Sequence, residues 1–310
     1  MKTALLFPGQ GSQYIGMGRD FYEKYQSSKH IFEALDSILN RNLSKLIFNG
    51  NIEELSQTEN SQPAIMTTSI AIFKALQDEK ILSYDSFHAV AGHSLGEYSA
   101  LVVNDSISFE DSVKLLKVRS RAMQESMPIG TGGMLALIGC DDQVITKVMN
   151  DASKYGKIFI ANDNANGQIV LSGEINSIEF ILNNTKHLNI RRAIRLPVSA
   201  PFHCELMKNA SDVMEKELKN INFNKFSVPI YSNVTSKICN EIDILDLLVK
   251  QVVSKVRWRE IIENLIVDGF QRFIEIGPGN VLTNLLKRAN KNVDAYSISK
   301  LEDFNKLSNI

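Results

Sequence analysis

Residues 88–101 read HAVAGHSLGEYSAL, and this stretch decides how the rest of the sequence is interpreted. Its first part, HAVA, is a short apolar run typical of a buried strand, and LGEYSALVV (95–103) begins a helix. Gly92, Ser94 and Gly96 fit the pattern G-x-S-x-G, in which a sharp turn between strand and helix presents a serine hydroxyl above a sheet. The stretch therefore predicts a nucleophilic Ser94. The alternative is a structural turn in which the serine only caps the helix.

Strand-like and helix-like segments alternate on both sides of this stretch. TALLF (3–7) has the composition of a strand, and apolar residues at helical spacing run through 27–41. Residues 62–80 predict a further helix with Pro63 in its first turn, and 272–290 predict a strand, a Gly-Pro-Gly turn and a helix. This alternation predicts a mainly parallel sheet covered by helices, so the expected fold class is α/β.

The middle of the chain has a different order. Residues 133–140, 142–155, 157–162, 167–173, 175–186 and 190–196 predict strand, helix, strand, strand, helix and strand, which is the order of the ferredoxin-like unit. Linker-like segments, MPIGTGG (127–133) and LPVSAP (196–201), bracket it. We therefore expect a large domain from 1–130 and 198–310, with a ferredoxin-like subdomain inserted at 131–197. A cleft between the two is a natural ligand site.

Composition and charge narrow the function classes. The 310 residues are 44% hydrophobic and 22% charged, as in ordinary soluble proteins. A net charge of −1 gives no support for nucleic acid or an anionic membrane as partner. No apolar run has membrane-spanning length, and the first one is too short for a signal peptide. Three widely spaced cysteines predict neither a disulfide framework nor a zinc site, so we expect a reducing cytoplasm as location.

A serine nucleophile needs a base, and histidine is the most frequent one. The chain has five histidines: His30, His88, His93, His187 and His203. His93 adjoins the serine, so its side chain should point away, and three of the others fit helix or strand-end positions. His203 leads because VSAPFHCELM (198–207) is a proline-containing loop, and catalytic residues concentrate in loops. Its neighbour Cys204 lies outside any nucleophile turn and is expected to be a small buried side chain.

FPGQGSQYIGMG (7–18) is a glycine-rich loop after the first predicted strand, where phosphate often binds. The dinucleotide pattern G-x-G-x-x-G fails because Tyr14 replaces the third glycine. The phosphate-loop pattern fails because Met17 and Gly18 stand where a lysine and a hydroxyl residue are needed. A nucleotide site is therefore disfavoured, and the loop is either a plain turn or serves another purpose.

Four segments taken together, 7–18, 91–101, 198–207 and EIGPGNVL (275–282), resemble the malonyl-CoA:acyl carrier protein transacylases of bacterial fatty acid synthesis. The similarity extends over nearly the whole chain. The family implies an α/β-hydrolase-like domain with a ferredoxin-like insert, in agreement with the organisation expected above. It also implies ping-pong transfer of malonyl from malonyl-CoA to the phosphopantetheine thiol of acyl carrier protein through a malonyl-serine ester, without a metal.

The resemblance assigns catalytic roles to individual residues. Ser94 is the nucleophile and His203 the base. The backbone N–H groups of Gln10 and Leu95 form the oxyanion hole, so the glycine-rich loop holds an oxyanion rather than a phosphate. No acidic residue stands out between serine and histidine, where a hydrolase triad would have one. In this family a backbone carbonyl orients the histidine instead, and the resemblance assigns it to Gln251, in LVKQVV (248–253).

Substrate-binding residues are assigned in the same way. Arg119 and Arg121 lie two positions apart on a predicted helix and diverge by about 200°, so only one can face a cleft. The family's malonate-binding arginine stands 25 residues after the serine, which selects Arg119, and a guanidinium suits a carboxylate bidentately. Phe202 matches a bulky residue that accompanies malonyl selection. Asn162 matches a residue of the family's substrate pocket, although it could equally be a strand-end turn residue. Gln251 is also counted among the substrate-binding residues.

The acidic acyl carrier proteins of this system call for basic docking residues. Candidates are Arg191, Arg192, Arg195, Arg257 and Arg259.

Two other functions stay open at this point. A plain esterase or thioesterase would be favoured by an acid partner for the histidine and no arginine in the cleft. A catalytically silent module that binds carrier proteins would be favoured by a missing serine or histidine.

Overall fold

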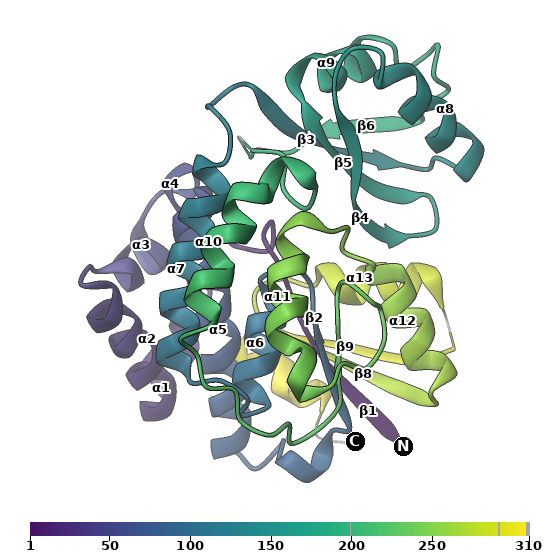
Figure 1. Ribbon diagram of the computed structural model, residues 1–310. Coiled ribbons are helices and arrows are strands. Elements are labelled where there is room, and N and C mark those ends of the chain that lie inside the picture. Colours follow the sequence, from purple (N-terminus) through teal and green to yellow (C-terminus); the bar gives the residue numbers. More distant parts are fainter. Residues whose placement is uncertain (199, 291, 308–310) are drawn as a thin grey trace.

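The computed structural model describes residues 1–198, 200–290 and 292–307, which form two β-sheets surrounded by helices (Figure 1). The larger sheet consists of β1 (Lys2–Phe7), β2 (Ala89–Gly92), β7 (Ile230–Tyr231), β8 (Phe270–Ile276) and β9 (Asp294–Ile298). Their order across the sheet is β7-β2-β1-β8-β9, and every neighbouring pair is parallel. The expected parallel sheet is confirmed.

The pairing of β1 with β2 decides where the site lies. Phe7, the last residue of β1, pairs with Gly92, the last residue of β2. Because parallel strands end at the same edge of a sheet, the glycine-rich loop after Phe7 and the serine turn after Gly92 leave that edge side by side. The N–H of His93 then donates to the carbonyl of Phe7 at 2.9 Å, which ties the two loops together.

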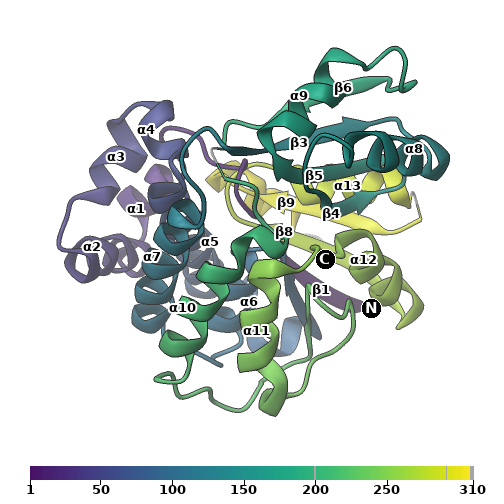
Figure 2. The same ribbon diagram turned by 45° about the horizontal axis from the view of Figure 1, so that its top comes forward.

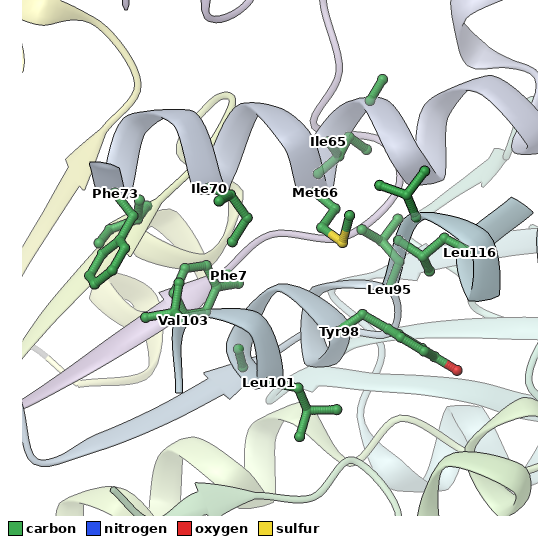
Figure 3. Packing of buried hydrophobic residues seen from close by; sticks show 14 of the residues in the cluster. Phe7, Ile65, Met66, Ile70, Phe73, Leu95, Tyr98, Leu101, Val103 and Leu116 are labelled. Atoms are coloured by element: carbon green, nitrogen blue, oxygen red, sulfur yellow. The ribbon is translucent and has the colours of Figure 1, made fainter. Parts of the chain in front are cut away.

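Helices cover both faces of the larger sheet. They are α1 (Arg19–Lys24), α2 (Gln26–Leu39), α3 (Leu43–Asn49), α4 (Ile52–Ser56), α5 (Thr58–Asp78), α6 (Gly96–Val103), α7 (Phe109–Glu125), α10 (Lys208–Leu218), α11 (Ile244–Val253), α12 (Trp258–Val267) and α13 (Val281–Ala289). Short 3₁₀ helices are η1 (Tyr84–Ser86), η2 (Glu205–Met207), η3 (Glu241–Asp243) and η4 (Leu301–Lys306). Leu5 and Phe7 join a cluster with α5, α6 and α7, part of which Figure 3 shows. Ala4 and Leu6 join another with α12 and α13. Burial on both faces explains the continuous apolar run of β1.

Helix α5 differs from the expectation at its start. It begins at Thr58, so Pro63 lies inside it and not in its first turn, and that expectation was wrong. A proline at this position cannot donate to the carbonyl four residues earlier, which belongs to Glu59. That carbonyl instead accepts a hydrogen bond from Arg41 Nη2 at 3.3 Å. A donor from outside the helix replaces the missing backbone bond, and the local sequence pattern gives no sign of it.

The smaller sheet contains β3 (Gly132–Ile138), β4 (Ile158–Ala165), β5 (Gln168–Glu174) and β6 (Arg192–Arg195), with α8 (Asp142–Ala152) and α9 (Ile175–Asn183) packed on it (Figure 2). Its order is β4-β5-β3-β6, and all neighbours are antiparallel. Numbered within the unit this is 2-3-1-4, so the expected ferredoxin-like insert is confirmed. All four strands fall within 131–197, and we propose this segment as a subdomain distinct from 1–130 and 198–310.

Strand β4 is longer than the sequence pattern predicted, and its second half contacts the larger unit. The N–H of Asp163 donates to the carbonyl of Val256 at 2.9 Å, and the N–H of Val256 donates to the carbonyl of Ala161 at 2.8 Å. Arg259 of α12 forms an ion pair with Asp163 at 2.8 Å. Asn162 therefore lies inside β4 and not at a strand end, because these extra partners continue the strand.

Candidate active site

The turn between β2 and α6 holds Ser94 in a conformation that few residues adopt. Ser94 has φ +54°, in the left-handed region, and its N–H donates to Asn233 Oδ1 at 2.7 Å. The glycines on either side of it permit the turn. A Cβ on Gly92 would lie 1.9 Å from the carbonyl of Gly96, and a Cβ on Gly96 would lie 2.2 Å from the carbonyl oxygen of Phe7. The G-x-S-x-G spacing is therefore a steric requirement here.

Gly92→Ala is expected to lower the free energy of unfolding by about 3 kcal/mol or more, because neither backbone segment at the clash can yield without opening the turn. Gly133→Ala is the matched control. Gly133 is also a buried strand glycine, but a Cβ there would meet nothing nearer than 4.0 Å. Urea unfolding followed by circular dichroism measures both variants. Equal stability of the two variants would contradict the steric account.

His203 lies against the serine. Its Nε2 is 2.7 Å from Ser94 Oγ, and its Nδ1 is 3.0 Å from the carbonyl oxygen of Gln251. A carbonyl can only accept, so the Nδ1 nitrogen carries the proton and Nε2 is free to accept from the serine hydroxyl. Like the serine, His203 has a positive φ, +60°. The structure thus brings together the hydroxyl and the imidazole that the sequence placed 109 residues apart.

Burial and the charge of Arg119 lower the pKa of His203 to about 3. The ring is therefore neutral at neutral pH, which is the form that can take a proton from the serine. The unfolded chain binds a proton at this histidine near pH 6.5, and the folded chain does so only near pH 3. Its contribution to folding stability therefore falls as the pH drops below about 6.5.

Arg119 of α7 is buried and points at the serine. Its Nη2 lies 3.1 Å from Ser94 Oγ and 2.8 Å from Gln251 Oε1, and its Nη1 lies 2.7 Å from Gln62 Oε1. Arg121 lies on the exposed side of the same helix and pairs with Glu125 at 2.8 Å. The structure thus places Arg119 at the serine and Arg121 in solvent. Neutral amide oxygens occupy the guanidinium group where a carboxylate could bind.

The two backbone amides expected to form the oxyanion hole lie on the two adjoining loops. Within the described residues, neither the N–H of Gln10 nor that of Leu95 donates a hydrogen bond. The loop around Gln10 packs tightly on the serine turn, because a Cβ on Gly9 would lie 2.6 Å from the carbonyl oxygen of His93. Leu95 precedes the first residue of α6, where the positive end of the helix dipole faces a developing negative charge. This arrangement agrees with an oxyanion hole, which stays a prediction.

Three further side chains were singled out from the sequence: Asn162, Phe202 and Cys204. Asn162 has a buried Oδ1 without a hydrogen-bond partner in the described residues. Phe202 is buried, and its carbonyl accepts a hydrogen bond from Ser172 Oγ at 2.6 Å. The roles of both in substrate binding stay predictions. Cys204 is buried, and burial raises the pKa of its thiol to about 12, so it is protonated and unsuited to nucleophilic attack.

Sequence reasoning missed two polar residues that contact the serine turn. Glu97 is an acid between Ser94 and His203 in chain order, fully buried, and it accepts a hydrogen bond from the side chain of Gln251. Acids are common in the first turn of a helix, so its position gave no sign of a special role. Asn233 follows the very short strand β7, and nothing in the pattern of that loop points to it.

The chain is similar in sequence to proteins of a known family. A family model described as acyl transferase domain matches residues 4–302. A malonyl CoA-acyl carrier protein transacylase of Bacillus subtilis is 42% identical to this chain, over 97% of it and 94% of its own length. The chain belongs to the malonyl CoA-acyl carrier protein transacylase family. The resemblance drawn from four sequence segments is thereby confirmed.

Solved structures of transacylases have the same fold. An acyl-carrier-protein S-malonyltransferase from Bartonella henselae is similar with a TM-score of 0.95 at 39% identity, covering 99% of this chain and 98% of its own. A malonyl-transacylase in complex with a type II PKS acyl-carrier protein has a TM-score of 0.95 at 35% identity and covers 100% of both chains. The expected α/β fold with its insert is therefore that of the transacylase family.

Proposed function

We propose that this chain transfers the malonyl group of malonyl-CoA to the phosphopantetheine thiol of acyl carrier protein, supplying units for fatty acid synthesis. One observation carries the proposal: a neutral imidazole lies 2.7 Å and a guanidinium 3.1 Å from the same hydroxyl, Ser94 Oγ. The imidazole can activate the hydroxyl, and the guanidinium can hold the free carboxylate of the acyl group. The names of the relatives, a transacylase and a complex with acyl carrier protein, support this choice.

The first half-reaction forms a malonyl-serine ester. His203 Nε2 takes the proton of Ser94 as Oγ attacks the thioester carbonyl of malonyl-CoA. The N–H groups of Gln10 and Leu95 hold the oxyanion of the tetrahedral intermediate. When the carbon–sulfur bond breaks, His203 returns its proton to the departing CoA sulfur. The ester then remains on the enzyme and CoA leaves.

The second half-reaction reverses these steps with another thiol. The phosphopantetheine thiol of the carrier gives its proton to His203 and its sulfur attacks the ester carbonyl. The bond from the carbonyl carbon to Oγ breaks, and the proton returns to Ser94. The products are malonyl thioester on the carrier and free enzyme, so no proton or electron is left over.

Arg119 gives the site its preference for an acid. In a malonyl-serine ester the carboxylate is separated from the ester carbonyl by a single methylene group, so it lies close to Oγ. The guanidinium beside Oγ is therefore placed to bind it with two parallel hydrogen bonds. A charged carboxylate is a stronger acceptor than the neutral amide oxygens of Gln62 and Gln251 that occupy the guanidinium now. We infer that the carboxylate replaces at least one of them.

Several observations weigh against the other functions. A catalytically silent module has no need for a serine in left-handed backbone with an imidazole at hydrogen-bond distance. A plain thioesterase typically has a carboxylate on its histidine, whereas here the Nδ1 of His203 meets a backbone carbonyl. Glu97 is buried nearby but contacts Gln251 and Asn233 instead. The buried Arg119 at the serine is also placed to bind a carboxylate, which uncharged acyl groups lack.

One assay separates the three functions. The protein is incubated with malonyl-CoA and holo acyl carrier protein, and intact masses of both proteins are recorded. Malonyl on the carrier, with a malonyl adduct on the enzyme when the carrier is left out, is expected. Apo carrier protein, which lacks the pantetheine thiol, is the control and should stay unloaded. Free malonate alone would indicate a thioesterase, and no product at all would indicate a binding module.

Docking of the acidic carrier requires basic residues that are not already engaged. Of the candidates, three are held in ion pairs: Arg195 with Glu179, Arg257 with Glu260, and Arg259 with Asp163. Arg191 and Arg192 are exposed and have no carboxylate partner in the described part of the chain. We propose that these two make the first contacts with the carrier, where rim charges mainly raise the association rate.

The proposal assigns each proton and charge to a side chain or backbone group and none to a metal. Over the described ranges, no group of three or more His, Cys, Asp or Glu side chains is placed to hold a metal ion.

Among the described residues, no helix has the length and apolar character that a membrane-spanning segment needs. A cytoplasmic location is part of the proposal. The three free cysteines agree with a reducing compartment.

A further inference from the structure

Glu97 is a buried acid at the active site that the mechanism above does not use. It is the second residue of α6 and is 1% exposed. Its Oε1 accepts a hydrogen bond from the backbone N–H of Asn233 at 3.2 Å, and its Oε2 accepts a short one from Nε2 of Gln251. Burying a carboxyl group is costly unless its oxygens are paired, and here both are. The contacts of its two partners show what this pairing accomplishes.

Gln251 connects Glu97 to three active-site groups. Its Nε2 also donates to the carbonyl oxygen of Ser94 at 3.0 Å, and its Oε1 accepts from Arg119 at 2.8 Å. Its backbone carbonyl accepts from His203. Arg119 can only donate, while Glu97 and the carbonyl of Ser94 accept, so the amide has one orientation that satisfies all its contacts. Glu97 therefore holds the residue that contacts the serine, the arginine and the histidine.

Asn233 connects Glu97 to the other side of the serine turn. Its Oδ1 accepts from the N–H of Ser94 at 2.7 Å, and its Nδ2 donates to the carbonyl of Gly92 at 2.7 Å. Together with Gln251, it satisfies both backbone polar groups of Ser94. A residue at φ +54° persists only where its surroundings fix it. Asn233 and Gln251 each depend on the Glu97 side chain for one of their own hydrogen bonds, and the carbonyl of Ser94 also accepts from the backbone N–H of Glu97 at 3.0 Å.

The ionised form of Glu97 fits these contacts best. Both partners present N–H donors, and a carboxylate only accepts, whereas a protonated carboxyl would turn one O–H toward a donor. Burial raises the pKa of Glu97 to about 7, against the two hydrogen bonds and the charge of Arg119, which lower it. The contacts therefore favour the ionised carboxylate of Glu97, whereas burial alone would favour the protonated, neutral form.

We propose that Glu97 is a positioning residue, which holds Gln251 and Asn233 so that Ser94 keeps its reactive backbone conformation with His203 and Arg119 in contact. This inference rests on Ser94 being the nucleophile of the proposed function. It assigns Glu97 no contact with substrate and no proton transfer. Its effect passes through the hydrogen bonds that Gln251 and Asn233 make to the serine.

The test measures the reactivity of Ser94 without CoA or carrier protein. Glu97→Gln keeps the shape of the side chain but turns one of its two acceptors into a donor, which then faces another donor. The rate constant for labelling of Ser94 by an uncharged fluorophosphonate, located by peptide mass mapping, is expected to fall roughly 10- to 100-fold. Labelling of Glu97→Gln within twofold of the wild-type rate would overturn the proposal.

Glu275→Gln is the matched control. Glu275 is also a fully buried carboxylate, and it accepts hydrogen bonds from the backbone N–H groups of Leu282 and Thr283 at 3.1 and 2.8 Å. Its replacement loses the same kind of interaction, and neither Glu275 nor its two partners has a hydrogen bond to Ser94 among the described residues. We expect labelling within twofold of wild type, with the thermal unfolding midpoint recorded for both variants. A loss equal to that of Glu97→Gln would mean general destabilisation and overturn the positioning role.

A swap of the two side chains tests the contact itself. In Glu97→Gln with Gln251→Glu, the amide at 97 can donate to the carboxylate at 251, so this contact is complementary again, while the carboxylate still cannot donate to the carbonyl of Ser94. Labelling should recover at least about threefold over Gln251→Glu, because that single variant sets two acceptors against each other at the 97–251 contact. A swap no faster than Gln251→Glu would overturn the proposal. If Glu97→Gln does not fold, the double variant is still compared with Gln251→Glu.

The outcomes separate this inference from the proposed function. A wild-type protein that is labelled at Ser94 but loads no malonyl onto the carrier counts against the proposed function. Slower labelling of Glu97→Gln in that same protein still supports the role of Glu97, because the probe needs neither malonyl-CoA nor carrier.

Discussion

Ser94→Ala is expected to abolish the malonyl adduct on the enzyme and to lower malonyl transfer by at least about 10⁴-fold, since loss of a serine nucleophile alone removes most of the catalysis. The variant keeps the turn, because alanine has the same Cβ as serine. It loses only the hydroxyl that contacts His203 and Arg119. Intact mass after mixing with malonyl-CoA measures the adduct, and a carrier-loading time course measures transfer.

Ser99→Ala is the matched control for this loss. Ser99 lies five residues later, buried inside α6, and its hydroxyl has no hydrogen-bond partner among the described residues. Its replacement removes the same hydroxyl group from the helix that follows the serine turn, and we expect transfer within twofold of wild type. An adduct of undiminished amount on Ser94→Ala would show that another residue is the nucleophile.

Arg119→Ala is expected to lower kcat/KM for malonyl transfer by about 10³-fold, the size typical of losing one partner of a buried charged pair. Acetyl transfer should fall far less, by about tenfold, because acetyl has no carboxylate. That remaining loss follows from the contacts of Arg119 with Ser94 and Gln251, which any substrate depends on. Parallel kinetics with malonyl-CoA and acetyl-CoA measure the two losses.

Arg121→Ala provides the comparison on the same helix. Its guanidinium is exposed and pairs with Glu125 in solvent, so the expected change in either reaction is within twofold. The decisive quantity is the difference between malonyl and acetyl losses in Arg119→Ala. Equal losses for the two substrates would remove Arg119 from carboxylate recognition and leave it a structural role at the serine.

The fold was predictable where the sequence pattern is set by local sterics and by burial. The apolar run of β1 and the spacing of Gly92, Ser94 and Gly96 reflect burial on both faces and a turn without room for side chains. The order of elements between 131 and 197 predicted the ferredoxin-like insert. The start of α5 was not predictable, because a distant arginine, Arg41, supplies the donor that Pro63 lacks.

The site was predictable only in part from the chain itself. Ser94 was predicted as the nucleophile from its turn. His203 was only the preferred one of five candidate histidines until the family resemblance was added. The divergence of Arg119 and Arg121 on a helix showed that only one of them can face a cleft, yet not which one. Glu97 and Asn233 escaped because their partners are distant in sequence, so no local pattern records those hydrogen bonds.

The left-handed backbone at position 94 also limits which amino acid can ever serve there. Threonine offers the same hydroxyl chemistry, but a β-branched residue is strongly disfavoured at φ +54°. Cysteine, unbranched and similar in size, is compatible with it. The choice among alcohol and thiol nucleophiles in this enzyme is thus constrained first by stereochemistry of the main chain and only then by reactivity.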